Sequence, residues 1–157
     1  MDQFNESFAS HWDELVGWEE RSRIDIPFLV SILKNYNCKD LLDVALGTGF
    51  HSINLLKKGF NVTSSDISES MIEIAKNNSK EHDVKLNLIC SDWSHLFSEN
   101  LKKFDCIFCL GNSLACENNR EKRESAILNW SKLLKDNGII ILDRRNYELI
   151  LKNRHFS

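Results

Sequence analysis

One continuous stretch, residues 41–66, most constrains what this chain can fold into; it reads LLDVALGTGFHSINLLKKGFNVTSSD. Its apolar start predicts a buried parallel strand, because a strand covered on both faces carries few polar side chains. Gly47 and Gly49 follow at the carboxyl end of that strand, where glycine adopts backbone angles that other residues avoid. Residues 51–58 are predicted as a helix, and a second strand follows with Asp66 at its tip. The stretch is therefore typical of a parallel α/β sheet.

The glycine turn and the two acidic residues around it favour a ligand site. In open α/β sheets, ligands bind at the carboxyl ends of the strands. A carboxylate at the tip of the second strand, here Asp66, can accept two hydrogen bonds from a ribose diol. A dinucleotide site would need G-x-G-x-x-G, but the third glycine position holds Ser52. Gly47 and Gly49 alone would be explained by a simple connecting turn; Asp43 before them and Asp66 after them favour a cofactor site.

The composition points to an ordinary globular chain. Its 157 residues suit one domain with one core. A net charge of −3 gives no indication of nucleic acid or an anionic membrane as a partner. The acidic start lacks the apolar segment of a signal peptide, and no stretch has the length of a transmembrane helix. A cytoplasmic location without membrane attachment is therefore expected.

The cysteines are predicted to be reduced and buried, because their odd number, five, falls in strand-like apolar segments. Cys106 and Cys109 have the spacing of a redox or metal pair, but they lie within a predicted strand. Residues three apart on a strand point to opposite faces, so core packing is the favoured role. No second pair completes a zinc site, and we expect no metal.

The remaining chain alternates helices and strands. Residues 1–37 are predicted as a helical cap, or as a lid over the cofactor site, with Pro27 opening a second helix. Residues 38–157 are predicted as the core of a single domain. Further strands are expected at residues 86–90, 104–110 and 139–142. This alternation predicts a Rossmann-like parallel sheet of five strands in the order 3-2-1-4-5, flanked by helices, with the ligand where strands 1 and 4 diverge.

The polar candidates all fall at the carboxyl ends of predicted strands, and this convergence is stronger than any single motif. Asp92 is placed to accept from an adenine amino group, with Trp93 as an apolar wall. A helix cap for Asp92 and core packing for Trp93 are equally favoured. Asn112 would otherwise close a turn, and an exposed arginine would otherwise pair with a surface acid. The set comprises Gly47, Gly49, Asp66, Asp92, Trp93, Asn112 and Arg145.

Three segments carry a family resemblance. Residues 43–49, DVALGTG, resemble motif I of class I S-adenosylmethionine-dependent methyltransferases. Together with LGNS at residues 110–113 and DRRNY at residues 143–147, they resemble the glycine N-methyltransferases, particularly the glycine/sarcosine N-methyltransferases of betaine synthesis. WDEL at residues 12–15 and WEER at residues 18–21 extend the likeness along nearly the whole chain.

The resemblance implies S-adenosylmethionine as cofactor and a role for each matching residue. It assigns no catalytic residue, because a bound neutral amine needs no general base. Two departures are Leu46, where those enzymes usually carry cysteine, and Asp92, where some carry asparagine. The implied roles are closure over the cofactor for Trp12 and Arg21, with Arg23 the competing match to Arg21; the methionine part for Ala45, Gly47 and Gly49; cofactor binding, with no part specified, for Asp43; the ribose for Asp66; the adenine for Asp92 and Trp93; the pocket floor for Leu110; and the amino-acid substrate for Asn112 and Arg145.

The resemblance also implies the activity: methylation of the nitrogen of glycine or sarcosine. A different small-molecule acceptor, or a cofactor-binding module without turnover, are the alternatives, and a dinucleotide oxidoreductase is a distant third. The family fold has two further strands and substrate residues beyond the fifth strand, which these 157 residues lack. The fifth strand is therefore expected to leave an open edge for a second copy of the chain or for a completing chain.

Overall fold

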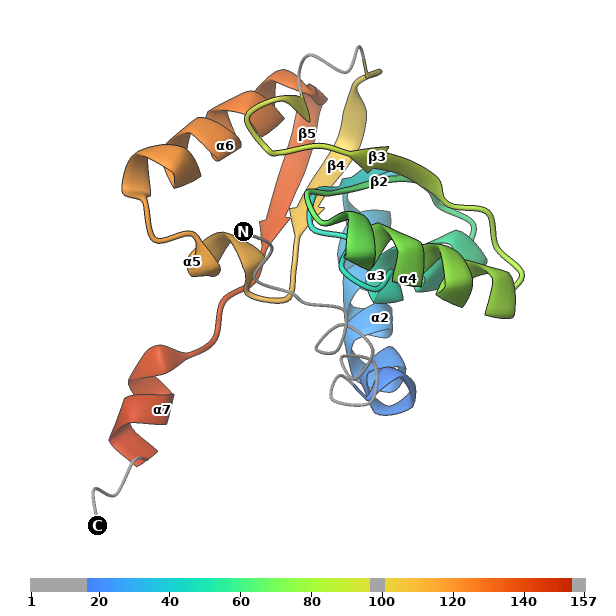
Figure 1. Ribbon diagram of the computed structural model, residues 1–157, viewed down its shortest axis with the longest axis horizontal. Helices are drawn as coiled ribbons and strands as arrows, with labels where there is room; N and C mark the ends of the chain where they lie inside the picture. The colour runs from blue at the N-terminus through green and yellow to red at the C-terminus, as the bar shows by residue number, and fades with distance from the viewer. Residues whose placement is uncertain (1–16, 97–100, 154–157) are drawn as a thin grey trace.

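A parallel sheet forms the centre of the computed structural model, which describes residues 17–96 and 101–153. The sheet has five strands in the order β3-β2-β1-β4-β5, which confirms the predicted topology (Figure 1). All four neighbouring pairs are parallel. The strands are β1 (Asp40–Asp43), β2 (Asn61–Asp66), β3 (Asn87–Cys90), β4 (Phe104–Cys109) and β5 (Leu134–Leu142).

Helices cover both faces of the sheet. α2 and α3 pack against one face, with α4 beside them over β2 and β3, whereas α6 covers the opposite face (Figure 1). Ser68 caps α4 by accepting from the Met71 N–H, as its position in the sequence predicts. The helices are α2 (Trp18–Asn35), α3 (Phe50–Lys57), α4 (Glu69–Glu81), α5 (Ser113–Cys116), α6 (Arg120–Lys132) and α7 (Tyr147–Asn153).

Alternating side chains of the central strands supply the two halves of the core. Leu41 joins the cluster under α2 and α3, and Leu42 joins the cluster under α6. Cys106 and Cys109 divide between the same two clusters, so the prediction of core packing on opposite faces is confirmed. All five cysteines are free, but Cys90 and Cys116 are exposed, so the expectation of buried thiols holds for only part of the set.

Two predicted boundaries are wrong. Pro27 lies inside α2 and does not open a second helix. The missing proline N–H removes one helical hydrogen bond, but burial of Ile26, Leu29 and Leu33 holds the two halves of α2 against the sheet. β5 begins at Leu134, five residues before the predicted strand, because Leu134 pairs with Phe104 ahead of a register shift.

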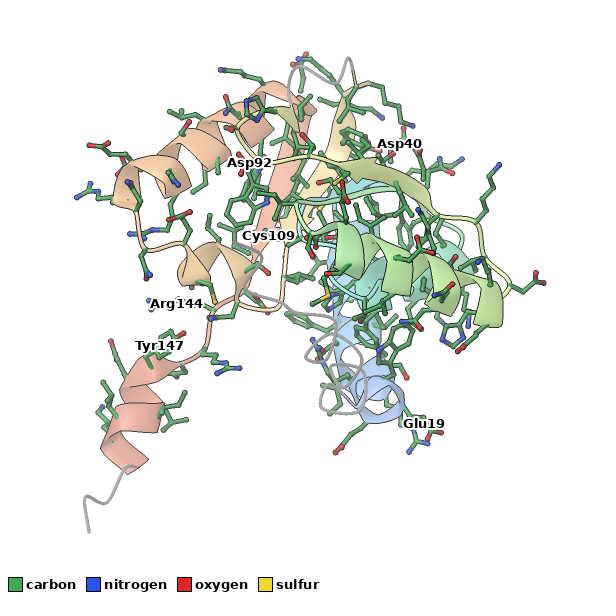
Figure 2. The ribbon with its side chains drawn as sticks, in the orientation of Figure 1. Glu19, Asp40, Asp92, Cys109, Arg144 and Tyr147 are labelled. Atoms are coloured by element: carbon green, nitrogen blue, oxygen red, sulfur yellow. The ribbon has the colours of Figure 1, made fainter. Side chains whose placement is uncertain are left out.

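A network of charges ties three strands together at the amino-terminal edge of the sheet. Lys135 on β5 lies 2.9 Å from the Asp40 carboxylate on β1 and 3.0 Å from the Asp105 carboxylate on β4. Lys102 lies 2.8 Å from the other oxygen of Asp40. The lysines lower the pKa of Asp40 well below its usual range, because both donate hydrogen bonds to the carboxylate. Figure 2 places Asp40 at the edge of the sheet opposite Arg144.

The chain after β5 leaves the body of the domain. α7 projects away from the sheet (Figure 1), and Leu149 and Leu151 on it are 54% and 59% exposed. Within residues 17–96 and 101–153, no strand pairs with the outer edge of β5. In the same described part of the chain, none of the helices combines the length and apolar character needed to cross a membrane.

Truncation of a central core residue tests this description of the core. Leu42→Ala is expected to lower the free energy of unfolding by about 2–5 kcal/mol, because it leaves a cavity between β1 and α6. Leu42 is fully buried. Urea denaturation measures the change, with Leu128→Ala as the control. Leu128 is 63% exposed on α6, so its truncation is expected to cost no more than about 0.5 kcal/mol. Equal losses in both variants would contradict the assignment.

Candidate functional site

The carboxyl-terminal edge of the sheet carries the glycine turn that the sequence predicts. Gly47 and Gly49 both adopt positive φ angles, 54° and 94°. A Cβ atom at Gly49 would lie 3.1 Å from the Ile53 side chain and 3.3 Å from the Ala75 side chain, so this glycine lets the turn pack against α3 and α4. A Cβ atom at Gly47 would meet nothing within 4 Å. Gly47 therefore faces open space, where a ligand can approach the main chain.

Asp43 lies beneath this turn, at the end of β1, and is only 1% exposed. Its Oδ2 accepts from the Ser52 hydroxyl at 2.7 Å, and its Oδ1 accepts from the Ala45 N–H at 3.1 Å. The Ser64 hydroxyl in turn donates to Ser52 at 2.8 Å. Asp43 thus connects β1 to the first turn of α3 and, through Ser52, to β2. Its direct role toward a cofactor stays a prediction, and its position supports the turn from below.

Burial makes Asp43 a weak acid. Desolvation raises the pKa of its carboxyl group to about 7, and the hydrogen bonds from Ser52 and Ala45 oppose only part of that rise. The nearby carboxylate of Asp66 adds to the rise. Close to neutral pH, the protonated and ionised forms of Asp43 are therefore both populated.

Asp66 joins the tip of β2 to the glycine turn. Its Oδ2 accepts from the Gly47 N–H at 2.8 Å, and its Oδ1 accepts from the Ser68 N–H at 3.0 Å. Asp66 thus links the tip of β2 to the glycine turn and to the start of α4. Its role toward a ribose stays a prediction.

Asp92 and Trp93 follow β3 at the same edge, and both have partners within the protein. The Asp92 carboxylate accepts from the N–H and the hydroxyl of Ser94 and so closes a turn after β3. The Trp93 indole N–H donates to the Val44 carbonyl at 2.6 Å, and its ring packs edge-on against Trp130 with centroids 5.4 Å apart. Trp93 therefore packs between the end of β1 and α6. Its role toward adenine stays a prediction.

Arg21, and not Arg23, faces the glycine turn. The Arg21 guanidinium lies 4.9 Å from the centre of the Phe50 ring, next to Gly49, and its Nε donates to Asp25 at 2.8 Å. Arg23 points to solvent and pairs with Glu19. The structure therefore favours Arg21 of the two competing matches. Trp12, the other residue expected to close over the cofactor, lies outside the described residues.

His51 lies against Arg21 in the first turn of α3. Its Nε2 is 3.5 Å from the Arg21 Nη2, and its ring packs edge-on against Phe50. Burial, followed by the positive charge of Arg21, lowers the pKa of His51 to about 4. A neutral imidazole nitrogen accepts a hydrogen bond from a guanidinium, whereas a protonated ring would repel it. At neutral pH His51 therefore supports the position of Arg21.

The ends of β4 and β5 are joined by a set of hydrogen bonds. Asp143, after β5, accepts from the N–H groups of Gly111 and Asn112 at 3.0 Å and 2.7 Å. The Asn112 Oδ1 accepts from the Arg145 N–H at 3.1 Å. The Arg145 side chain is exposed, and no ion pair joins it to Asp143 among the described residues. Leu110, the predicted pocket floor, is buried just before this turn.

Three contributors to this edge were not assigned a role from the sequence: Ser52, Asp143 and Tyr147. Ser52 stands at the third position of the glycine pattern, and Asp143 and Tyr147 stand at either end of DRRNY. Their positions in motifs were a usable signal, but their partners lie on other strands or helices. Among the described residues, no group of three or more histidine, cysteine or acidic side chains is placed to hold a metal ion.

Comparison with known proteins identifies the fold family. A family model described as a methyltransferase domain matches residues 41–138, which is more than half of the chain. The chain belongs to the methyltransferase domain family. The match begins within β1 and includes the glycine turn, Asp66 and Asn112, whereas Arg21 and residues 143–147 lie outside it.

Named relatives resemble the chain along most of its length. The glycine/sarcosine N-methyltransferase of Aphanothece halophytica is 39% identical over 159 residues, an alignment that covers 99% of this chain and 60% of the relative. That of Parasynechococcus marenigrum (strain WH8102) is 39% identical over 150 residues, covering 96% and 53%. This methyltransferase chain therefore spans between 53% and 60% of the length of these two relatives.

A solved structure gives the same result for the fold. The S-adenosylmethionine-dependent methyltransferase from Clostridium acetobutylicum ATCC 824 superposes with a TM-score of 0.73 at 29% identity, over 90% of this chain and 57% of that chain. The Rossmann-like methyltransferase fold predicted from the sequence is thus confirmed.

The buried acid of this methyltransferase domain predicts a specific pH dependence of stability. Because folding raises the pKa of Asp43, its contribution to stability is fully present below the ordinary carboxyl pKa and is lost as the pH rises through about 7. Asp43→Asn removes this titration. Between pH 5 and 7, the free energy of unfolding of the wild type is therefore expected to fall, relative to the variant, by up to about 1.4 kcal/mol per pH unit.

Urea denaturation at a series of pH values measures this difference. Asp136→Asn is the matched control, because Asp136 is an exposed carboxyl group on β5. A difference between wild type and Asp43→Asn that stays constant from pH 5 to 8 would rule out a buried titrating carboxyl group.

Proposed function

We propose that this chain carries the cofactor-binding part of an S-adenosylmethionine-dependent N-methyltransferase that acts on glycine, sarcosine or both. One observation carries the proposal: two groups of residues lie at the same edge of one sheet. The first is the glycine turn with Asp66, and the second is the hydrogen-bonded pair Asn112 and Arg145. The first suits a nucleoside cofactor and the second a small carboxylate. The two glycine/sarcosine N-methyltransferases named above support this reading, although the chain spans only part of their length.

The residues at this edge fit the proposed cofactor. Gly47 borders open space, and the adjoining Asp66 carboxylate is the acceptor proposed for the hydroxyls of a ribose. Arg21, held by Asp25 and Phe50, offers a positive charge for the carboxylate of the methionine part. Ala45 and Leu110 provide apolar surroundings on either side of the turn.

Arg145 is the proposed partner of the acceptor carboxylate. A planar guanidinium binds a carboxylate through two parallel hydrogen bonds, which fixes the orientation of the acceptor as well as its position. Glycine and sarcosine have little apolar surface, so their carboxylate must provide much of the recognition. An arginine at the end of β5 suits such a substrate.

The protein contributes orientation and exclusion of water. S-adenosylmethionine supplies an electrophilic methyl group on a positively charged sulfur. The acceptor amine must be neutral to attack, because a protonated amine has no lone pair. Arg145 would hold the carboxylate so that the amine faces the glycine turn, and the apolar side chains around Ala45 would disfavour the charged ammonium form. No described side chain needs to accept the proton within this scheme.

The proposal includes three further expectations. The protein acts in the cytoplasm, on a small amino-acid substrate, without nucleic acid or membrane as a partner. The open edge of β5 is proposed to pair with a second copy of the chain or with a completing chain. Residues 1–37 are proposed to cap the cofactor site of a single domain formed with residues 38–157. α2, the part of that cap within the described residues, lies beside α3.

Calorimetric titration with S-adenosylmethionine, S-adenosylhomocysteine and NAD tests the cofactor. We expect the two sulfur compounds to bind and NAD not to bind, because Ser52 replaces the third glycine of the dinucleotide pattern. Asp66→Ala is expected to weaken binding by about 1–3 kcal/mol through loss of charge-assisted hydrogen bonds. Saturable binding of NAD alone, or unchanged affinity in folded Asp66→Ala, would refute the assignment.

Replacement of Arg145 tests the acceptor. Arg145→Lys and Arg145→Ala should both leave S-adenosylhomocysteine binding nearly intact and suppress methylation of glycine and sarcosine, because lysine keeps the charge but loses the two-pronged geometry. Transfer from labelled S-adenosylmethionine is the measurement. Arg144→Ala is the matched control, since Arg144 is the exposed neighbour. Cofactor binding with no transfer to either amino acid would favour a different acceptor or a binding module, and full activity in Arg145→Ala would exclude the role of Arg145.

A further inference from the structure

We propose that the Tyr147 hydroxyl is a positioning group for acceptor binding: through Asn112, it holds Arg145 at the carboxyl edge of the sheet. This inference rests on the proposed function, because it concerns the side chain that would meet the acceptor carboxylate. It adds a second role for Asn112, which the family resemblance places in contact with the acceptor.

The side-chain amide of Asn112 forms hydrogen bonds with both Tyr147 and Arg145. Its Nδ2 donates to the Tyr147 hydroxyl oxygen at 3.1 Å, and its Oδ1 accepts from the Arg145 backbone N–H at 3.1 Å. The Tyr147 hydroxyl also lies 3.4 Å from that Oδ1. Figure 2 shows Tyr147 at the start of α7, beside Arg144. One amide therefore fastens the backbone of Arg145 and the beginning of α7 to the turn after β4.

The contacts of Asn112 use three of the four hydrogen-bonding positions of its side-chain amide. An asparagine amide has two N–H donors and one oxygen with two lone pairs. The second N–H points to the Cys116 sulfur at 3.5 Å, in addition to the contacts with Tyr147 and Arg145. Asn112 is 8% exposed. Both of its N–H groups and one lone pair of its oxygen thus have partners within the protein, so the amide links Tyr147 to Arg145.

The other end of the same segment is fastened independently. Asp143 accepts from the N–H groups of Gly111 and Asn112, so the turn after β4 holds the segment 143–147 at both ends. Arg145 lies between these two attachments, with its side chain exposed. Fixing the backbone leaves only side-chain torsions to be ordered when Arg145 binds a carboxylate, which lowers the entropic cost of binding. Loss of the Tyr147 hydroxyl would free one of the two ends.

Tyr147→Phe tests this role in the 157-residue protein, with Tyr36→Phe as the matched control. Tyr36 is the other tyrosine, exposed at the end of α2. In Tyr147→Phe we expect the KM for glycine or sarcosine to rise about fivefold, the usual effect of one hydrogen bond. We expect kcat to change less than about twofold and S-adenosylhomocysteine affinity to stay the same. A purely structural role would not separate KM from kcat in this way.

A double-variant cycle tests whether Tyr147 acts through Asn112. If it does, the double variant should show the same rise in KM as Asn112→Ala alone, because the Tyr147 hydroxyl has no amide left to hold. Additive losses would instead show that Tyr147 acts independently of Asn112 and would overturn the proposed role. Wild-type KM in Tyr147→Phe would overturn it as well.

Amide hydrogen exchange provides a readout that needs no turnover. Exchange of the Arg145 backbone N–H, followed by nuclear magnetic resonance, should accelerate severalfold in Tyr147→Phe and stay unchanged in Tyr36→Phe. If the wild type neither binds nor methylates glycine or sarcosine, the proposed acceptor is wrong. The exchange comparison alone then decides whether Tyr147 holds the backbone of Arg145 in place. Equal exchange at Arg145 in the wild type and Tyr147→Phe would show that Tyr147 does not hold Arg145.

Discussion

A carboxyl group buried at the end of the central strand connects the parts of this domain. Asp43 closes β1, accepts from the backbone of the glycine turn and accepts from Ser52 on α3. Ser64 extends the connection to β2 through Ser52. Burial of an acid is costly unless its oxygens have partners, so the turn, the helix and both strands must be in place together.

Local patterns were enough to predict the sheet and the placement of the glycine turn and Asp66 at one of its edges. The apolar run before Gly47 and the tip position of Asp66 depend on near neighbours in the sequence, and parallel topology restricts how such units can join. The hydrogen bond between the Gly47 N–H and Asp66 follows from that topology, because neighbouring parallel strands end at the same edge. The sequence alone therefore predicted that Gly47 and Asp66 lie at the same edge of the sheet.

Other features depend on contacts that a sequence pattern does not encode. Pro27 suggested a helix start, but burial of the residues around it outweighs the lost hydrogen bond. The early start of β5 depends on pairing with Phe104, far away in the chain. The Asn112–Tyr147 hydrogen bond joins residues 35 positions apart, and either residue alone is an ordinary turn or helix residue. Packing and long-range pairing decided these cases, and propensity did not.

The charge network around Lys135 has a consequence for how such a domain can change over time. It joins β1, β4 and β5 at the edge farthest from the glycine turn, so cohesion of the sheet and recognition of ligands use different side chains. Substitutions at Arg145 or Tyr147 leave that network untouched. New acceptor preferences can therefore accumulate in laboratory or natural evolution without a matching loss of folded protein.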